Sequence, residues 1–138
     1  MLKVLLWIWQ LPQNLFGFVL SRRYTYKSIR YVGKDWRNVY FKPFFRSGIS
    51  LGNYIILDTW YMGKTCSKET VAHEYGHCRQ SLMLGWLYLI LVGIPSITRN
   101  ICDRIFHKKW SAERREQWYY NGYPEKWADK LGDVHRKE

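Results

Sequence analysis

The chain has 138 residues, of which 47% are hydrophobic and 18% aromatic, and its formal net charge is +11. This length is enough for one domain with a real core, so folding does not depend on disulfides. Its three cysteines fit neither a paired zinc clip nor a disulfide framework, which favours a reducing compartment. The charge predicts attraction to anionic lipid or acidic partners. No recognition helix or RNA-binding signature accompanies it, so we expect no nucleic acid partner.

Residues 1–21 form an apolar N-terminal segment, distinct from the domain expected over residues 22–138. Gln10 and Pro12 interrupt this segment, whereas a simple transmembrane helix needs about 20 largely unbroken apolar residues. The segment also lacks the small-residue cleavage site of a signal peptide. Two interpretations stay open. The segment lies in a membrane interface as short apolar pieces or a kinked anchor, or it is a helix buried on the protein's own core.

Basic residues are concentrated beside the apolar segments. Between residues 22 and 46, eight Lys and Arg residues face Asp35 as the one acid, and more basic residues follow a second apolar run, over residues 99–109. This placement is typical of segments that bind anionic lipid on the cytoplasmic side. We therefore expect association with the cytoplasmic face of a membrane. For the first cluster, a solvated basic face of a sheet is an equally good interpretation.

The order of the expected elements predicts an α+β fold. Residues 24–57 are rich in β-branched and aromatic residues and are bounded by Gly and Pro, which predicts a small antiparallel sheet. Turns are expected at Lys34-Asp35 and at Ser47-Gly48. A helix is expected from about Ser67, as its N-cap, to Leu84, where Gly85 ends it.

The rest of the chain predicts further helices. The apolar run "WLYLILVGIPSI" predicts one short helix closed by Pro95, and residues 99–117 are polar and helical. The turn-rich "YYNGYP" is followed by a last helix with Pro124 in its first turn. The charged tail, residues 133–138, is expected to be frayed.

The stretch "HEYGH", residues 73–77, lies inside the first of these helices and has the residue types of a metal site. Positions four apart share one helix face, about 6 Å apart along the axis, so His73 and His77 can converge on one ion. Glu74 lies about 100° round the helix and can still reach a water in the open coordination position. This is the layout of zinc hydrolases, in which the glutamate is the general base. By chance the pattern arises in roughly one chain of this length in a hundred or fewer.

A catalytic zinc site needs a third protein ligand. In "PEKWADKL", Glu125 and Asp129 share one helix face. Glu125 can bind the metal while Asp129 accepts a hydrogen bond from the outer nitrogen of a ligand histidine. Ala128 is small, which allows this helix to pack close to Gly76. The alternative is that Glu125 is an exposed first-turn acid favoured by the helix dipole.

A histidine pair in HExxH followed by ExxAD resembles the gluzincin class of zinc metallopeptidases. The resemblance implies one Zn²⁺ bound by His73, His77 and Glu125, with Glu74 as the general base and Asp129 as the partner of a ligand histidine. The blocks "LPQNL", "SLGNYI", "HEYGH" and "EKWADKLG" are also similar to small bacterial zincin-like proteins without a known substrate. The implied fold is a minimal zincin-like domain, a small antiparallel sheet followed by the motif helix and C-terminal helices.

Two further features concern the substrate. Tyr119, Tyr120 and Tyr123 precede Glu125 and are candidate donors to the oxyanion of a tetrahedral intermediate, although each can equally be a packed aromatic. The stretch "LGNYIIL", directly before the motif helix, is the expected sheet edge for an extended peptide.

The expected function is that of a membrane-associated zinc metallopeptidase-like hydrolase acting on a peptide or protein substrate. Water activated by the metal would attack the peptide bond, with Glu74 as the general base. Because His73 and Glu125 must meet at one metal, the apolar run over residues 82–97 cannot cross a bilayer once between them. The alternative function is that of a zinc-bound, non-proteolytic protein that binds a membrane or a partner.

Overall fold

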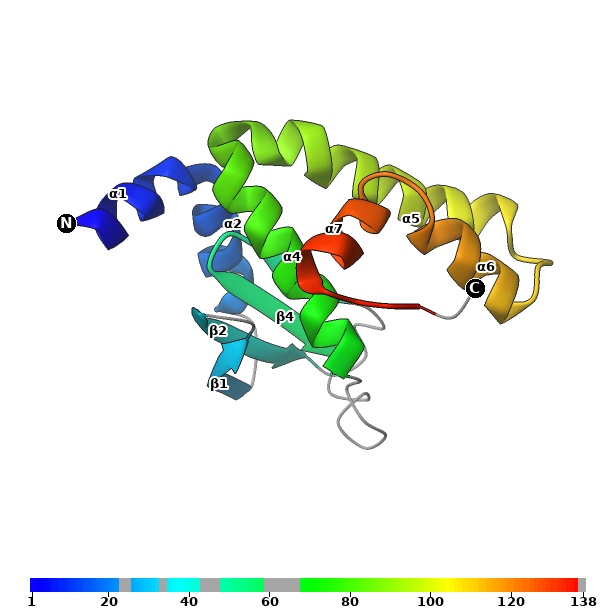
Figure 1. Cartoon of the computed structure of the whole chain (residues 1–138), viewed down its shortest axis with the longest axis horizontal. Coiled ribbons are helices and arrows are strands. Elements are labelled where there is room, and N and C mark those ends of the chain that lie inside the picture. Colours follow the sequence, from blue (N-terminus) through cyan, green and yellow to red (C-terminus); the bar gives the residue numbers. More distant parts are fainter. Residues whose placement is uncertain (23–25, 33–34, 43–47, 59–67, 137–138) are drawn as a thin grey trace.

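The computed structural model describes residues 1–22, 26–32, 35–42, 48–58 and 68–136 (Figure 1). The fold is α+β. Its described helices are α1 (Leu2–Trp9), α2 (Leu11–Ser21), α4 (Lys68–Leu84), α5 (Ile94–Phe106), α6 (Ala112–Tyr120) and α7 (Glu125–Gly132). A 3-10 turn (Gly85–Leu87) and a π-helical segment (Leu89–Gly93) connect α4 to α5.

The described strands form a four-stranded sheet in the order β1-β2-β4-β3. Their bounds are β1 (Tyr26–Val32), β2 (Asp35–Lys42), β3 (Ile49–Leu51) and β4 (Tyr54–Asp58). The β1–β2 and β3–β4 pairs are antiparallel, whereas β2 and β4 are parallel, with Asn38 opposite Tyr54. The expected all-antiparallel sheet is therefore wrong, because the sheet is mixed.

The reason for this difference is a turn inside "GISLGNYIIL", which reads as a single strand. Gly52 has φ +61°, a conformation that favours glycine, and the chain reverses there between β3 and β4. The apolar strand β4 then lies inside the sheet, with Ile55, Ile56 and Leu57 all buried. A continuous apolar run is typical of such an interior strand.

The sheet packs against α4 (Figure 1). Val39 of β2 and Ile55 and Leu57 of β4 form one buried cluster with Tyr75 and Cys78 of α4. This core places the motif helix directly over the sheet.

The helices α4 and α7 approach each other at backbone distance. A Cβ atom added at Gly76 would lie 1.9 Å from the Ala128 carbonyl oxygen, and one at Gly132 would lie 2.1 Å from the Ala72 carbonyl oxygen. The Arg79 guanidinium also donates to the Leu131 carbonyl oxygen at 3.1 Å. The expected close packing of Ala128 on Gly76 is confirmed.

The region between α4 and α7 differs from expectation at two points. Gly85, with φ +54°, follows α4 as expected, but Pro95 does not close a helix. It lies in the first turn of α5, where the missing N–H costs no hydrogen bond, and α5 continues to Phe106. The polar segment over residues 99–117 is then divided, because Ser111 caps a separate helix, α6, and its hydroxyl accepts from the Arg114 N–H.

The turns expected at Lys34-Asp35 and Ser47-Gly48 each include a residue outside the described part of the chain, as does the N-cap at Ser67. The tail is not frayed as far as residue 136. Val134 is buried, and Arg136 pairs with Asp129.

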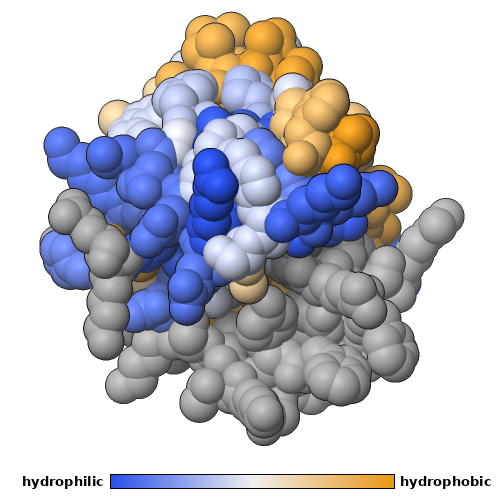
Figure 2. Space-filling view, turned by 90° about the vertical axis from the view of Figure 1, so that its right-hand side faces the viewer, coloured by the Kyte–Doolittle hydropathy of each residue, from blue (hydrophilic) through white to orange (hydrophobic). Residues whose placement is uncertain are grey.

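Among the described helices, none is by itself long and apolar enough to cross a membrane. The pair α1 and α2 passes the same test of length and composition together, with a bend of 85°. Figure 2 shows that hydrophobic side chains gather along one edge of the molecule, apart from the hydrophilic ones.

We predict that Gly76→Ala lowers the free energy of unfolding by about 2 kcal/mol or more, because its methyl group collides with the α7 backbone. The control is Gly93→Ala in a helical segment, whose Cβ would lie 3.6 Å from its nearest neighbour, an ordinary van der Waals contact. Chemical unfolding monitored by circular dichroism measures both. Equal stability of the two variants would contradict the close contact.

Candidate metal centre

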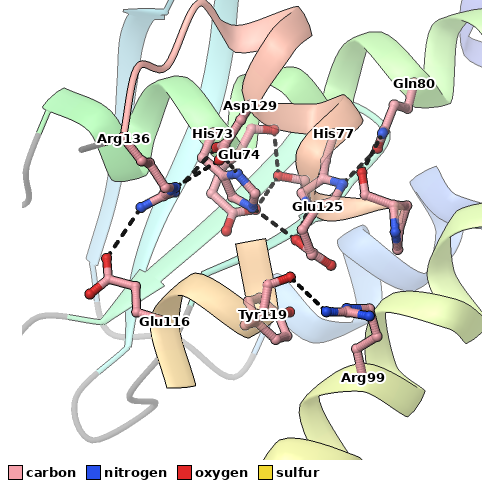
Figure 3. Close-up of polar contacts among 12 residues, drawn as sticks. His73, Glu74, His77, Gln80, Arg99, Glu116, Tyr119, Glu125, Asp129 and Arg136 are labelled. Atoms are coloured by element: carbon pink, nitrogen blue, oxygen red, sulfur yellow. Dashed lines mark hydrogen bonds and ion pairs between the residues drawn. The ribbon is translucent and has the colours of Figure 1, made fainter. Parts of the chain in front are cut away.

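Three buried side chains from two helices converge on one point (Figure 3). His73 and His77 come from α4, and Glu125 comes from the first turn of α7. Their ligand atoms all lie within 4.8 Å of one another, close enough to hold a metal ion. The packing of Gly76 against Ala128 brings the two helices within reach.

Each histidine is fixed at its outer ring nitrogen. His73 Nδ1 lies 2.6 Å from Asp129 Oδ1, and His77 Nδ1 lies 2.7 Å from Gln80 Oε1. A carboxylate can only accept, so His73 Nδ1 donates. Gln80 Nε2 donates to the Pro124 carbonyl oxygen at 3.1 Å, which leaves its Oε1 to accept from His77. In the neutral rings, both Nε2 atoms therefore carry lone pairs.

These two lone pairs point at the same carboxylate. Glu125 Oε2 lies 3.0 Å from His73 Nε2 and 3.1 Å from His77 Nε2. Three acceptors this close repel one another unless a proton or a metal ion lies among them. Glu125 Oε1 is buried and has no hydrogen-bond partner among the described residues. The donor set of two imidazoles and one carboxylate fits a zinc ion, and it also suits other transition metals.

The electrostatics of the group follow from its contacts. Burial, which lowers the pKa of an imidazole, is outweighed at His73 by hydrogen bonds to Asp129 and Glu125, so its pKa is raised to about 9. At Glu125, burial acts to raise the pKa, but the bonds from His73 and His77 hold it well below its usual range. The Glu125 side chain is therefore an ionised carboxylate, the form that binds cations.

Arg136 supports Asp129 from the other side, and it is a residue that the sequence did not identify. Its Nε donates to Asp129 Oδ2 at 2.7 Å and its Nη2 to Oδ1 at 3.2 Å. The guanidinium also lies 3.3 Å from the ring centroid of Tyr120. Asp133, in the left-handed conformation with φ 59°, ends α7 and allows the tail to turn back. The sequence offered one signal for this turn, which was Asp133 at the end of the last helix.

Glu74 is held by the neighbouring strand. The Ser50 hydroxyl of β3 lies 2.7 Å from Glu74 Oε2. Gly48 lies beside the same carboxylate, since a Cβ there would be 2.1 Å from Glu74 Oε1. Tyr88 donates to the Ser50 carbonyl oxygen at 3.0 Å and so fixes β3 in turn. Neither Ser50 nor Tyr88 carries a recognisable motif.

A cleft of about 580 Å³ opens over these residues. It is lined by His73, Glu74, His77 and Glu125, by residues 48–51, and by parts of α5 and α6. The strand at this wall is β3, an edge of the sheet, whereas β4 is interior. The expectation that "LGNYIIL" forms the edge therefore holds for Leu51 of β3 and is wrong for β4.

The three tyrosines are placed differently. Tyr119 and Tyr120 line the cleft, and burial raises the pKa of both hydroxyls, which stay protonated. The Tyr120 ring meets the His73 ring edge-on at 5.0 Å between centroids. The Tyr123 hydroxyl instead donates to the Leu91 carbonyl oxygen at 2.6 Å, and 54% of this residue is exposed.

The remaining histidines lie elsewhere. The His107 ring stacks on Trp110 at 3.7 Å between centroids, with 12% of its side chain exposed. His135 is exposed in the tail.

No family model, curated protein or solved structure matches this chain. What the structure establishes is a buried group of two histidines and a glutamate that could hold a metal ion.

We predict about one metal ion per purified chain, and much less in Glu125→Ala, because the variant loses one of three ligands. The control is Glu113→Ala, which removes an exposed carboxylate of α6. Elemental analysis gives the stoichiometry, and circular dichroism shows that the variants are folded. Full metal content in folded Glu125→Ala would mean that Glu125 is not a ligand.

A second prediction concerns Asp129, which fixes the His73 ring. Asp129→Asn should weaken metal binding by about 10–100-fold, because the amide is a poorer acceptor for the imidazole N–H. Asp133→Asn is the matched control, since Asp133 is exposed and asparagine tolerates its left-handed conformation. Competition with a chelating dye measures the affinities. Equal affinities in the two variants would remove Asp129 from the site.

Proposed function

We propose that the protein is a zinc-dependent hydrolase of the gluzincin type that cleaves peptide bonds. The observation that carries this proposal is the combination of a buried His73–His77–Glu125 group and the Glu74 carboxylate on one cleft. A purely structural metal site has no need of an open cleft or of a carboxylate beside it.

His73, His77 and Glu125 would hold the metal, and Asp129 and Gln80 would keep both Nε2 atoms directed toward it. When bound, zinc lowers the pKa of water and polarises a carbonyl oxygen. The metal identity is part of the proposal, because the donor set does not by itself select zinc.

Glu74 would act as the general base. It takes a proton from the attacking water and gives it to the leaving amine nitrogen, so that one carboxylate serves both steps. The Ser50 hydroxyl, 2.7 Å from Glu74 Oε2, supports this role by fixing the carboxylate. The absence of a side chain at Gly48 leaves room beside Oε1.

An extended peptide would lie along β3. Among the described strands, β3 is an edge of the sheet and it borders the cleft, so a substrate chain could add beside it. The Tyr119 and Tyr120 hydroxyls are the proposed donors to the oxyanion, because both residues line the cleft and stay protonated. Tyr123 is less suited, since its hydroxyl is already bonded to Leu91.

The decisive variant is Glu74→Gln. We expect it to keep zinc and to lose peptide hydrolysis by about 100-fold or more, because the amide cannot take up a proton. Glu69→Gln is the matched control, since Glu69 lies on the same helix, lines the same cleft and is exposed. Cleavage of a quenched fluorescent peptide library measures activity, and elemental analysis measures zinc.

Equal activity of Glu74→Gln and wild type would refute the mechanism. Zinc in the wild type with no hydrolysis of any peptide would favour the non-proteolytic alternative, a zinc-bound protein that binds a membrane or a partner.

A further inference from the structure

The helix α2 buries polar residues and exposes apolar ones. Its buried residues are Gln13, Asn14, Gly17 and Ser21. Its exposed large apolar residues are Leu15, Phe16, Phe18 and Val19. A helix on the surface of a water-soluble protein shows the reverse arrangement, with the apolar stripe toward the core.

The buried amides of α2 are bonded to the protein. Gln13 Nε2 lies 3.0 Å from Ser81 Oγ and 2.8 Å from the Gly85 carbonyl oxygen. Asn14 Oδ1 accepts from the Asn53 backbone N–H at 2.9 Å. These contacts fix the rotation of α2, so its apolar side chains are held outward.

Two neighbouring helices also present apolar side chains to the outside. The helix α1 buries none of its residues, which include Leu5, Trp7 and Ile8. The helix α5 is described over its whole length and likewise buries no residue. Its isoleucines recur at helical spacing and are 50–59% exposed: Ile94, Ile97, Ile101 and Ile105.

These apolar surfaces are joined by two tryptophans. Trp9 Nε1 donates to the Leu82 carbonyl oxygen at 2.9 Å, and Trp86 Nε1 donates to the Ile8 carbonyl oxygen at 2.9 Å. A Cβ at Gly85 would lie 2.3 Å from the Trp9 ring. The junction of α1 and α2 is therefore locked to the start of the run that leads into α5. We call the exposed apolar side chains of α1, α2, residues 83–91 and α5 the apolar face.

We propose that the apolar face seats the protein in the interfacial layer of a membrane that contains anionic lipid. The charges beside the face support a lipid partner. Residues 1–22 contain no Asp or Glu, and exposed basic residues stand at the ends of the two apolar stretches: Arg22, Arg104, Lys108 and Lys109. The one acid of α5, Asp103, is paired with Arg115 at 2.6 Å. Anionic headgroups attract such a border, and tryptophans are favoured at this depth.

The same helix α5 also borders the metal cleft. Ser96, Asn100 and Asp103 line the cleft, Ile94, Ile101 and Ile105 belong to the apolar face, and Ile97 belongs to both. The cleft and the lipid would be separated by one helix, which is about 10 Å across. A further step rests on the proposed function: the substrates would be peptide segments close to the membrane surface.

The test is flotation of the full chain with vesicles, one set of phosphatidylcholine and one with phosphatidylglycerol added at about one part in three. Two triple variants remove apolar side chains: Leu15→Gln with Phe16→Gln and Val19→Gln on α2, and Ile94→Gln with Ile101→Gln and Ile105→Gln on α5. The control, Glu113→Gln with Lys126→Gln, changes two exposed residues of α6 and α7 and leaves the net charge the same.

We expect the wild type and the control to float with the anionic vesicles, and less so in high salt, which screens the headgroups. Each triple variant should bind at least about tenfold more weakly, because it loses apolar burial in lipid. Two variants on different helices keep the test valid if one fails to fold.

Equal flotation of the wild type and both triple variants would overturn the proposal, as would a wild type that stays with neither vesicle. If such a wild type is a dimer and the triple variants are monomers, the face binds a second copy of the chain.

The substrate class is tested separately, by comparing cleavage of one peptide free in solution and acylated in vesicles. Loss of all hydrolysis would refute the proposed function and leave the flotation result standing.

Discussion

The contact between α4 and α7 is the constraint on which the metal centre depends. His77 and Glu125 are 48 residues apart in sequence, yet their ligand atoms lie 3.1 Å apart. This is possible because Gly76 and Gly132 remove the side chains that would otherwise keep the helix backbones apart. The backbone of the facing helix fills the space beside each glycine, and this close approach brings His73, His77 and Glu125 within reach of one another.

The parts of the site that could be predicted from the sequence are those fixed by local spacing. The histidines lie one helical turn apart, and so do Glu125 and Asp129, so each pair has a defined face once its helix is expected. Gln80 also obeys local spacing, because it lies three residues after His77 on the same helix. Arg136 and Ser50 could not be predicted in this way, because each reaches the site through the tertiary path of the chain.

The errors in the fold have a similar cause. No turn was expected at Gly52, and Pro95 was expected to end a helix, because the effect of a glycine or proline depends on its position within an element. Gly52 divides an apolar run into two strands, while Pro95 starts a helix rather than ending one. For the N-terminal segment, composition alone could not predict the orientation of the helix. Its apolar content was evident, but which side of α2 faces outward is decided by the partners of Gln13 and Asn14.

In the sequence, the apolar run lies between the two ligands His77 and Glu125. This order affects the conformational entropy of the unfolded chain. An ion held jointly by His77 and Glu125 would act as a cross-link that closes a loop of 48 residues, and this loop contains the π-helical segment and all of α5. Closing a loop removes conformational entropy from the unfolded chain, much as a disulfide does. The ion would thereby contribute to holding α5 in place as well as to any chemistry in the cleft.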